Sequence, residues 1–243
     1  MYKIIWIFIT ISIVSCSQDC LESPGQITRQ EITLDAFEGI IVGRGIQLTI
    51  KEDTVQQVIV ETGENRQDNV HFNIQNGILE IYADDLCMLS GTFAPVKIFI
   101  SSPNISSIRN ASENTVSSDG ILTFSELTLL VEDYESDYLN VGDFDLQLDN
   151  QRVEAVSNGI ANIYLNGQTN FLSVKYYNGI GRFEGENLIA QKVFVFHRAE
   201  NSIKVNPQQS LTGNIYSIGD VISYNHPPIV SVIEHYEGQL IFY

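Results

Sequence analysis

Positively charged residues are scarce in this chain of 243 residues, which has 13 Lys and Arg against 30 Asp and Glu, a net charge of −17. Nucleic-acid binding depends on basic patches that release counterions from phosphates, so this charge excludes a nucleic-acid partner. Ala, which favours helices, is also rare, with 8 copies against 32 Ile and 19 Val. Because β-branched residues fit pleated, half-buried surfaces, the composition predicts an all-β fold with a packed core.

No hydrophobic run is long enough to cross a bilayer, because the longest, residues 4–14, has only eleven positions. This run follows Lys3 and ends in Ile-Val-Ser-Cys at 13–16, which is the order of a secretory signal. The segment 13–16 resembles the lipobox of bacterial lipoproteins, which implies cleavage before Cys16 and acylation of that cysteine. The alternatives are an N-terminal β-strand, or a secretory signal whose cysteine is incidental.

The lipoprotein interpretation assigns residues 1–15 to a signal peptide and residues 16–30 to a tether that follows the lipid anchor. The mature chain then carries about −18, and its acyl chains bind the membrane despite that charge. Ser17, not Asp, follows the acylated cysteine, which by resemblance to lipoprotein sorting signals implies the bacterial outer membrane. Exposure at the cell surface is a further expectation.

Cysteine is scarce too, with three copies, and only Cys20 and Cys87 remain after Cys16. An exported protein can form disulfides, so these two form either a disulfide that clamps the tether to the body or two free thiols. The sequence has no CxxC motif and no Cys/His cluster. We therefore expect no metal and no cofactor.

Sustained helical periodicity is absent, and short alternating or β-branched runs follow one another between turn residues. Asn76-Gly77 lies between two such runs, and this dipeptide is the strongest short hairpin signal. The N-terminal part is therefore predicted to be irregular and partly antiparallel. Its predicted strands are 27–34, 40–50, 57–61, 70–74, 78–82 and 96–100.

From roughly residue 110 the chain repeats with a period of about 20. Small residues mark the repeat at intervals of 20, 20, 20 and 19, namely Gly159, Gly179, Ala199, Gly219 and Gly238. Such a period predicts a parallel β-solenoid (β-helix), in which each coil needs neighbours to bury its apolar face. Small residues suit corners where successive backbones stack closely. An antiparallel sandwich with regularly spaced strands is the alternative.

Segments 157–163 (Ser-Asn-Gly-Ile-Ala-Asn-Ile) and 178–183 (Asn-Gly-Ile-Gly-Arg-Phe) resemble the coils of the head GIN domain family of bacterial adhesins. Residues 37–50 resemble the opening signature of that family, although the eponymous Gly-Ile-Asn reads Gly-Ile-Gln at 45–47. The resemblance implies a single right-handed β-solenoid domain over 31–243, located on the cell envelope. The activity of the family is essentially uncharacterised.

Catalysis on a β-solenoid would need side chains one period apart that converge on one face. Glu184 and Glu186 lie in one predicted coil, and Asn162, Arg182 and Ser202 stack around a shared face at a spacing of 20. The two glutamates are the candidates for a glycan-cleaving site, because glycosidases use paired carboxylates. A surface arginine among acidic residues is the alternative for Arg182. No nucleophile elbow, P-loop or dinucleotide motif occurs, so we expect a non-enzymatic protein.

Two further groups could bind a partner. Aromatic residues recur on the coils, and we expect most of them in the core, with Tyr164 and Tyr224 as the exposed pair. Acidic residues gather in 133–149, where we expect a solvated face in preference to a Ca²⁺ site; they are Asp133, Glu135, Asp137, Asp143, Asp145 and Asp149.

The sequence thus predicts a lipid-anchored adhesion or interaction module whose partner is an envelope glycan or protein. A carbohydrate-binding or glycan-cleaving β-helix protein is the alternative. The possible contact residues are Tyr164, Tyr224, Arg182 and Glu184.

Overall fold

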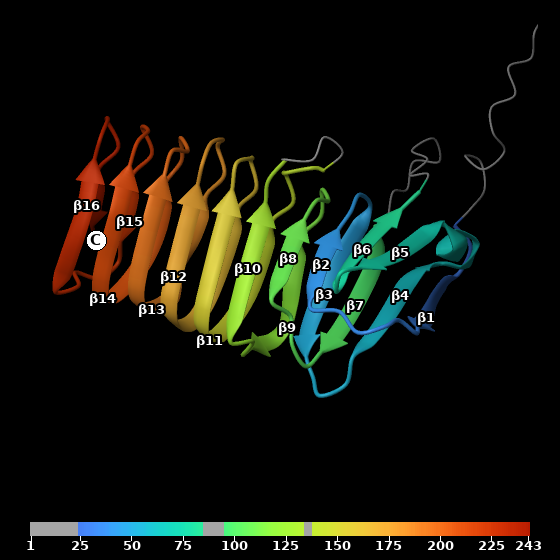
Figure 1. The fold of residues 1–243 in the computed structure, drawn as a ribbon. Coiled ribbons are helices and arrows are strands. Elements are labelled where there is room, and N and C mark those ends of the chain that lie inside the picture. Colours follow the sequence, from blue (N-terminus) through green and yellow to red (C-terminus); the bar gives the residue numbers. More distant parts are fainter. Residues whose placement is uncertain (1–23, 85–94, 134–137) are drawn as a thin grey trace, which may run out of the picture.

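The computed structural model describes residues 24–84, 95–133 and 138–243. The predicted signal peptide, the acylation site at Cys16 and the possible disulfide between Cys20 and Cys87 lie outside the described residues. Within the described part the molecule is an elongated stack of strands, with β1 near one end and the C-terminus at the other (Figure 1).

The fold is all-β, as the composition predicts, and its one helical element is the short 3₁₀ turn η2 (Glu64–Asn69) among the described residues. The strands are β1 (Ile27–Ile32), β2 (Gly39–Val42), β3 (Ile46–Glu52), β4 (Gln57–Gly63), β5 (Val70–Gln75), β6 (Ile78–Ala83), β7 (Val96–Ser102), β8 (Ser107–Asn110), β9 (Val116–Leu122), β10 (Glu126–Val131), β11 (Phe144–Ser157), β12 (Ile163–Tyr176), β13 (Phe183–His197), β14 (Ile203–Ile215), β15 (Val221–Ser223), β16 (Ile229–Glu234) and β17 (Leu240–Phe242).

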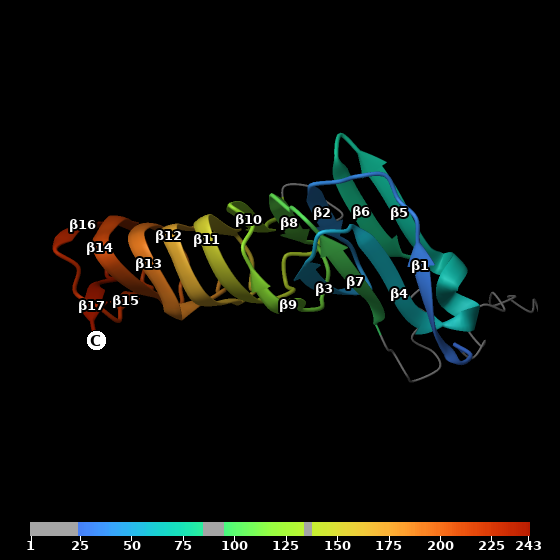
Figure 2. The same ribbon diagram turned by 90° about the horizontal axis from the view of Figure 1, so that it is seen from below.

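These strands form a curled mixed sheet, whose two rows face each other across the core (Figure 2). Row 1 runs through β5, β6, β2, β8, β10, the C-terminal halves of β11 to β14, and β16. Row 2 runs through β1, β4, β7, β3, β9, the N-terminal halves of β11 to β14, β15 and β17. The long strands β11 to β14 belong to both rows.

Strands β11 to β14 pair in parallel at the predicted period. Phe144 is opposite Ile163, Ile163 is opposite Phe183, and Phe183 is opposite Ile203, which gives offsets of 19, 20 and 20 residues. The pairing stays parallel to β17, where Val221 is opposite Leu240. Parallel strand pairing with a period near 20 is therefore confirmed for this part, and the antiparallel alternative is wrong there.

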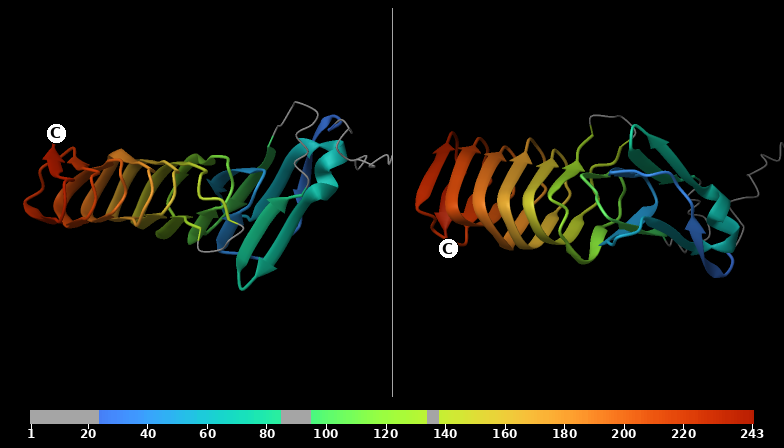
Figure 3. Two further views of the ribbon diagram at one scale, coloured as in Figure 1. Left: turned by 90° about the horizontal axis from the view of Figure 1, so that it is seen from above. Right: turned by 60° about the horizontal axis from the view of Figure 1, so that its bottom comes forward.

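The N-terminal part is partly antiparallel, also as predicted. Asn76 (φ 52°) and Gly77 (φ 75°) make the tight turn between β5 and β6, and both need the left-handed region that Asn and Gly tolerate. Strand β4 is antiparallel to both β1 and β7. Together with η2, these strands close this end of the stack (Figure 3).

Inward side chains form columns that run along the stack. One column contains Leu127, Val153, Leu172, Val193 and Leu211, which are opposite one another in successive coils and at most 1% exposed. The buried core cluster begins at Phe37. A chain that starts at Pro24 therefore contains this whole core and should fold by itself.

The corners between coils depend on the small marker residues. Gly179 has a φ of 91°, and a Cβ at this position would lie 2.0 Å from the carbonyl oxygen of Gly159 in the preceding coil. The same oxygen accepts hydrogen bonds from the backbone N–H groups of Ile180 and Gly181, at 3.1 and 3.2 Å. The predicted need for small residues where backbones approach closely is confirmed at this corner.

Substitution of Gly179 by Ala should therefore destabilise the protein by at least about 3 kcal/mol, because it combines a strained φ with a steric clash against backbone. Gly120 is the matched control, since its φ of 90° is similar and nothing lies within 4 Å of the point that a Cβ would occupy there. Gly120→Ala should cost only about 1 kcal/mol. Urea unfolding of both variants measures the difference, and equal losses would contradict the close-approach argument.

Candidate interaction surface

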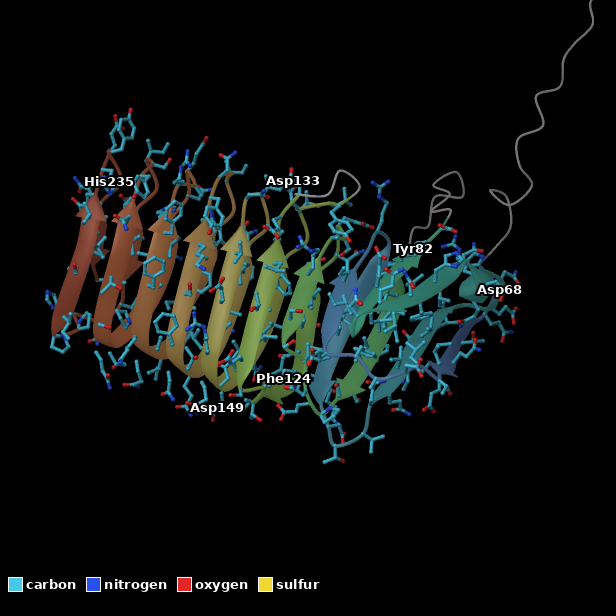
Figure 4. The ribbon with its side chains drawn as sticks, viewed as in Figure 1. Asp68, Tyr82, Phe124, Asp133, Asp149 and His235 are labelled. Carbon is cyan, nitrogen blue, oxygen red and sulfur yellow. The ribbon has the colours of Figure 1, made fainter. Side chains whose placement is uncertain are left out.

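The outer side of row 1 carries a stacked column of aromatic rings, which we call the aromatic column. It consists of Tyr177, Phe196, Tyr216 and His235, whose neighbouring ring centroids are 5.1, 5.2 and 4.1 Å apart. Each ring comes from a different turn of the repeat. His235 ends the column on the last coil (Figure 4).

The aromatic column is accessible to solvent and has apolar neighbours at the corners. Tyr177 is 37% and Tyr216 40% exposed, while Phe196 is partly buried between them. Three isoleucines are about half exposed in the corner turns of the same coils, namely Ile160, Ile180 and Ile218. Exposed apolar side chains that recur on successive coils mark a candidate interaction surface.

The sequence-based expectation that most repeat aromatics are core residues was wrong for Tyr177 and Tyr216. It holds for Tyr176, which is fully buried and donates a hydrogen bond from its hydroxyl to the Arg182 carbonyl at 2.9 Å. Burial raises the pKa of the Tyr176 phenol well above its usual value. The missed signal is the spacing of 177, 196, 216 and 235, because residues one period apart share a face.

The residues proposed from the sequence lie on a different surface. Tyr164 and Glu184 are opposite each other on the outer side of row 2, and Lys204 follows in the next coil. Tyr164 is 40% exposed. Arg182 is exposed in the turn that precedes β13.

Glu184 is held in an ion pair. Its carboxylate lies 2.6 Å from the Lys204 ammonium, and the Glu186 carboxylate lies 3.8 Å from the same nitrogen. The pKa of Lys204 is raised, mainly because its ammonium donates a hydrogen bond to the Glu184 carboxylate. In a glycosidase the paired carboxylates flank the scissile bond, whereas here the Lys204 ammonium lies between them. This geometry does not support a hydrolytic role for the pair.

Tyr224 is partly buried, and its ring packs at 5.0 Å from the ring of Tyr243. The two predicted contact tyrosines therefore lie in different settings: Tyr164 is exposed in the middle of the stack, and Tyr224 lies near its C-terminal end.

The acidic residues of 133–149 do not form one site. Asp133 and Asp149 lie at opposite edges of the stack (Figure 4). Asp143 accepts a hydrogen bond from the backbone of Asn162 at 2.7 Å, and Asp149 accepts one from the Gln168 amide at 2.9 Å. Glu135 and Asp137 lie outside the described residues. Among the residues that are described, no group of three His, Cys, Asp or Glu side chains is arranged to hold a metal ion.

The comparison with protein families decides the classification. Residues 36–227 match the family described as "Putative auto-transporter adhesin, head GIN domain". The chain belongs to the head GIN domain family. The match covers most of the chain and includes both the parallel coils and the antiparallel N-terminal part.

Solved structures of other bacterial proteins share this fold. A protein described as a "putative adhesin" from Bacteroides fragilis is 19% identical, with a TM-score of 0.80 over 90% of this chain and 97% of that one. A "putative lipid binding protein" from Parabacteroides distasonis is 15% identical, with a TM-score of 0.59 over 89% and 97% of the two chains. No curated protein matches this head GIN domain protein in sequence.

No helix among the described residues of the head GIN domain protein is long and apolar enough to span a bilayer.

His197 is a buried titratable group in the core of the head GIN domain. It is fully buried between Tyr176 and Ile215 of the adjacent coils, and neither of its ring nitrogens has a partner in hydrogen-bonding geometry. Burial lowers the pKa of His197 to about 4, and the backbone of Asn201 and the charge of Asp220 oppose this shift only in part. The imidazole is therefore neutral in the folded protein at pH 7.

The folded protein should lose stability as the pH falls through the window from about 6.5 to 4. In this window the unfolded state binds a proton at His197 and the folded state does not, so the loss approaches about 3 kcal/mol at pH 4. His197→Leu should remove this part of the pH dependence, whereas His226→Leu, at a histidine nearer the surface, should keep it. Urea unfolding at a series of pH values measures both, and identical pH slopes for the two variants would refute the assignment.

Proposed function

We propose that this protein is a lipid-anchored adhesion module of the bacterial cell envelope. It binds an envelope glycan or protein through surface complementarity and catalyses no reaction. Membership of an adhesin family and the adhesin descriptions of structural relatives support a role of this kind. The observation that carries the proposal is the exposed aromatic column, which is continuous over successive coils.

In this proposal residues 31–243 are a single right-handed β-solenoid domain, residues 1–15 are a signal peptide, and residues 16–30 are the tether. Acyl chains on Cys16 bind the outer membrane, and the domain extends from it at the cell surface. The parallel register of β11 to β14 and the position of β1 at the end opposite the C-terminus support this arrangement.

The aromatic column suits binding more than chemistry. Its rings present apolar edges at about 5 Å intervals, and the flanking isoleucines widen this apolar surface. Aromatic side chains contribute large apolar areas with few rotatable bonds, so they dominate the energetics of many interfaces. The glycan-cleaving alternative has no comparable support, because Lys204 pairs with Glu184.

The anchor can be tested by metabolic labelling of cells with an alkyne-modified fatty acid. The full chain should incorporate the label and fractionate with the outer membrane, and Cys16→Ala should lose both properties. Cys20→Ala is the matched control and should retain the label, because it lies outside the lipobox. Labelling of Cys16→Ala at the level of the unmodified protein would overturn the anchor.

The binding surface can be tested by adherence of cells that produce the full chain to immobilised envelope extract and to a glycan array. The double variant Tyr177→Ser/Tyr216→Ser should lower adherence by about tenfold, because it removes two exposed rings of the column. Tyr164→Ser is the control, since Tyr164 and Tyr216 are both 40% exposed but lie on different rows.

Protease treatment of intact cells and an antibody assay should first show equal amounts of each variant at the surface. Equal adherence of the double variant and the unmodified protein would overturn the assignment of the aromatic column. Protection of the protein from protease in intact cells would overturn the adhesive function itself. Signals on glycans or on protein extract would identify the partner class.

A further inference from the structure

The C-terminal end of the stack has two open edge strands. Strand β16 pairs with β14, and β17 pairs with β15, while no described strand pairs with the other side of either one. Side chains that occupy inward columns are uncovered here. Val230 is 39% exposed, although Leu211, its neighbour in the same column, is fully buried.

Large apolar side chains are exposed at this end, beside the polar residues Ser231, Glu234, His235, Glu237 and Gln239. In β16, Ile229 is 60% and Ile233 57% exposed, and the exposed residues continue through β17 to the C-terminal residue. The end surface, as we call it, comprises Ile229, Val230, Ile233, Tyr236, Ile241, Phe242 and Tyr243. Natural edge strands are normally protected by Lys, Pro or bulges, because an unpaired strand is a template for pairing with another chain.

The end surface has less protection by charge than the other end of row 2, although Pro227 and Pro228 precede β16 and Glu234 lies within it. Edge strand β1 carries Arg29 and Glu31 among its exposed residues. Residues 221–243, in contrast, contain no Lys or Arg, and their only acidic residues are Glu234 and Glu237. Strands β16 and β17 together carry one charged residue, Glu234.

The geometry points to a second copy of this chain as the partner of the end surface, in an end-to-end dimer with two-fold symmetry. A two-fold axis perpendicular to the stack makes β16 antiparallel to β16 of the second copy, which completes the backbone hydrogen bonds of both edges. The inward columns of the two copies then continue into each other.

The charge pattern fits such a pairing. When the two β16 strands are centred on Ser231, Val230 lies opposite Val232 of the second copy and Glu234 lies opposite Pro228. The two Glu234 carboxylates are then separated by six residues of strand, roughly 20 Å, which is more than twice the Debye length at physiological ionic strength. The pairing therefore brings no like charges of β16 together.

The size of the end surface also fits a dimer. Its seven partly exposed apolar side chains offer on the order of 700 Å², and a standard specific interface buries roughly 800 Å² on each partner. A two-fold contact uses the same surface on both copies, so it produces a closed dimer and not a fibre. This inference stands on the geometry of the end and is independent of the proposed adhesive function.

Sedimentation velocity of residues 24–243 tests the dimer. A reversible monomer–dimer equilibrium is expected, and the dimer should become tighter as NaCl is raised from about 0.05 to 0.5 M, because salt screens the repulsion between two chains of high negative charge. Val230→Lys should raise the dissociation constant of the dimer by at least about 30-fold, as expected for a residue at the centre of an interface. Because Lys makes the chain less negative, charge repulsion cannot explain that loss.

Ile160→Lys is the matched control, since Ile160 is 51% exposed but lies several coils from the end, and it should dimerise like the unmodified protein.

Hydrogen exchange should show protection of the β16 amides that increases with protein concentration. Ile229→Lys provides a second test if Val230→Lys shows altered circular dichroism. A strictly monomeric protein at high concentration and high salt, an open-ended polymer, or equal loss of dimer in Ile160→Lys would overturn the inference.

Discussion

Parallel stacking of one coil on the next is the interaction on which the rest of this structure depends. A coil of about 20 residues cannot enclose a core by itself, because its inward side chains are covered only by the coils above and below. In the column of Phe144, Ile163, Phe183 and Ile203, each residue is fully buried because it has such neighbours. Burial of one such side chain contributes about 1.5–3 kcal/mol, while ordering costs about 1–2 kcal/mol for each residue. A coil is therefore stable only as part of the stack.

Stacking also determines where the chain can carry function. Inward positions are committed to the core, where even a histidine (His197) is held neutral and fully buried. Outward positions repeat at the same interval, so similar side chains in successive coils form columns on the surface. The rings of Tyr177, Phe196 and Tyr216 are such a column, and the Glu184–Lys204 pair belongs to another. Binding surfaces on this fold are thus extended along the stack.

The sequence predicts the all-β class, the period, the hairpin at Asn76-Gly77 and the small corner residues, because each depends on local chemistry or on spacing. It does not predict which aromatic columns face outward. Alternation assigns inside and outside within one strand, but the register between β12, β13 and β14 shifts at irregular positions. A shift of one residue exchanges the two faces. Tyr176 shares the inward face of Leu172 and Val174, whereas Tyr177 follows the end of β12 and is exposed.

The two ends of the stack differ in strand arrangement and in the side chains that they expose to solvent. The N-terminal end departs from the repeat, and its antiparallel strands and η2 turn charged and polar residues such as Arg29 toward solvent. The C-terminal end keeps the repeat up to β17 and leaves apolar residues of the last coil uncovered. Since a coil is stable only between neighbours, this last coil has the strongest tendency to gain a partner. Residues 221–243 contain two acidic residues and no Lys or Arg, so the high negative charge of the molecule opposes contact with a second copy only weakly at this end.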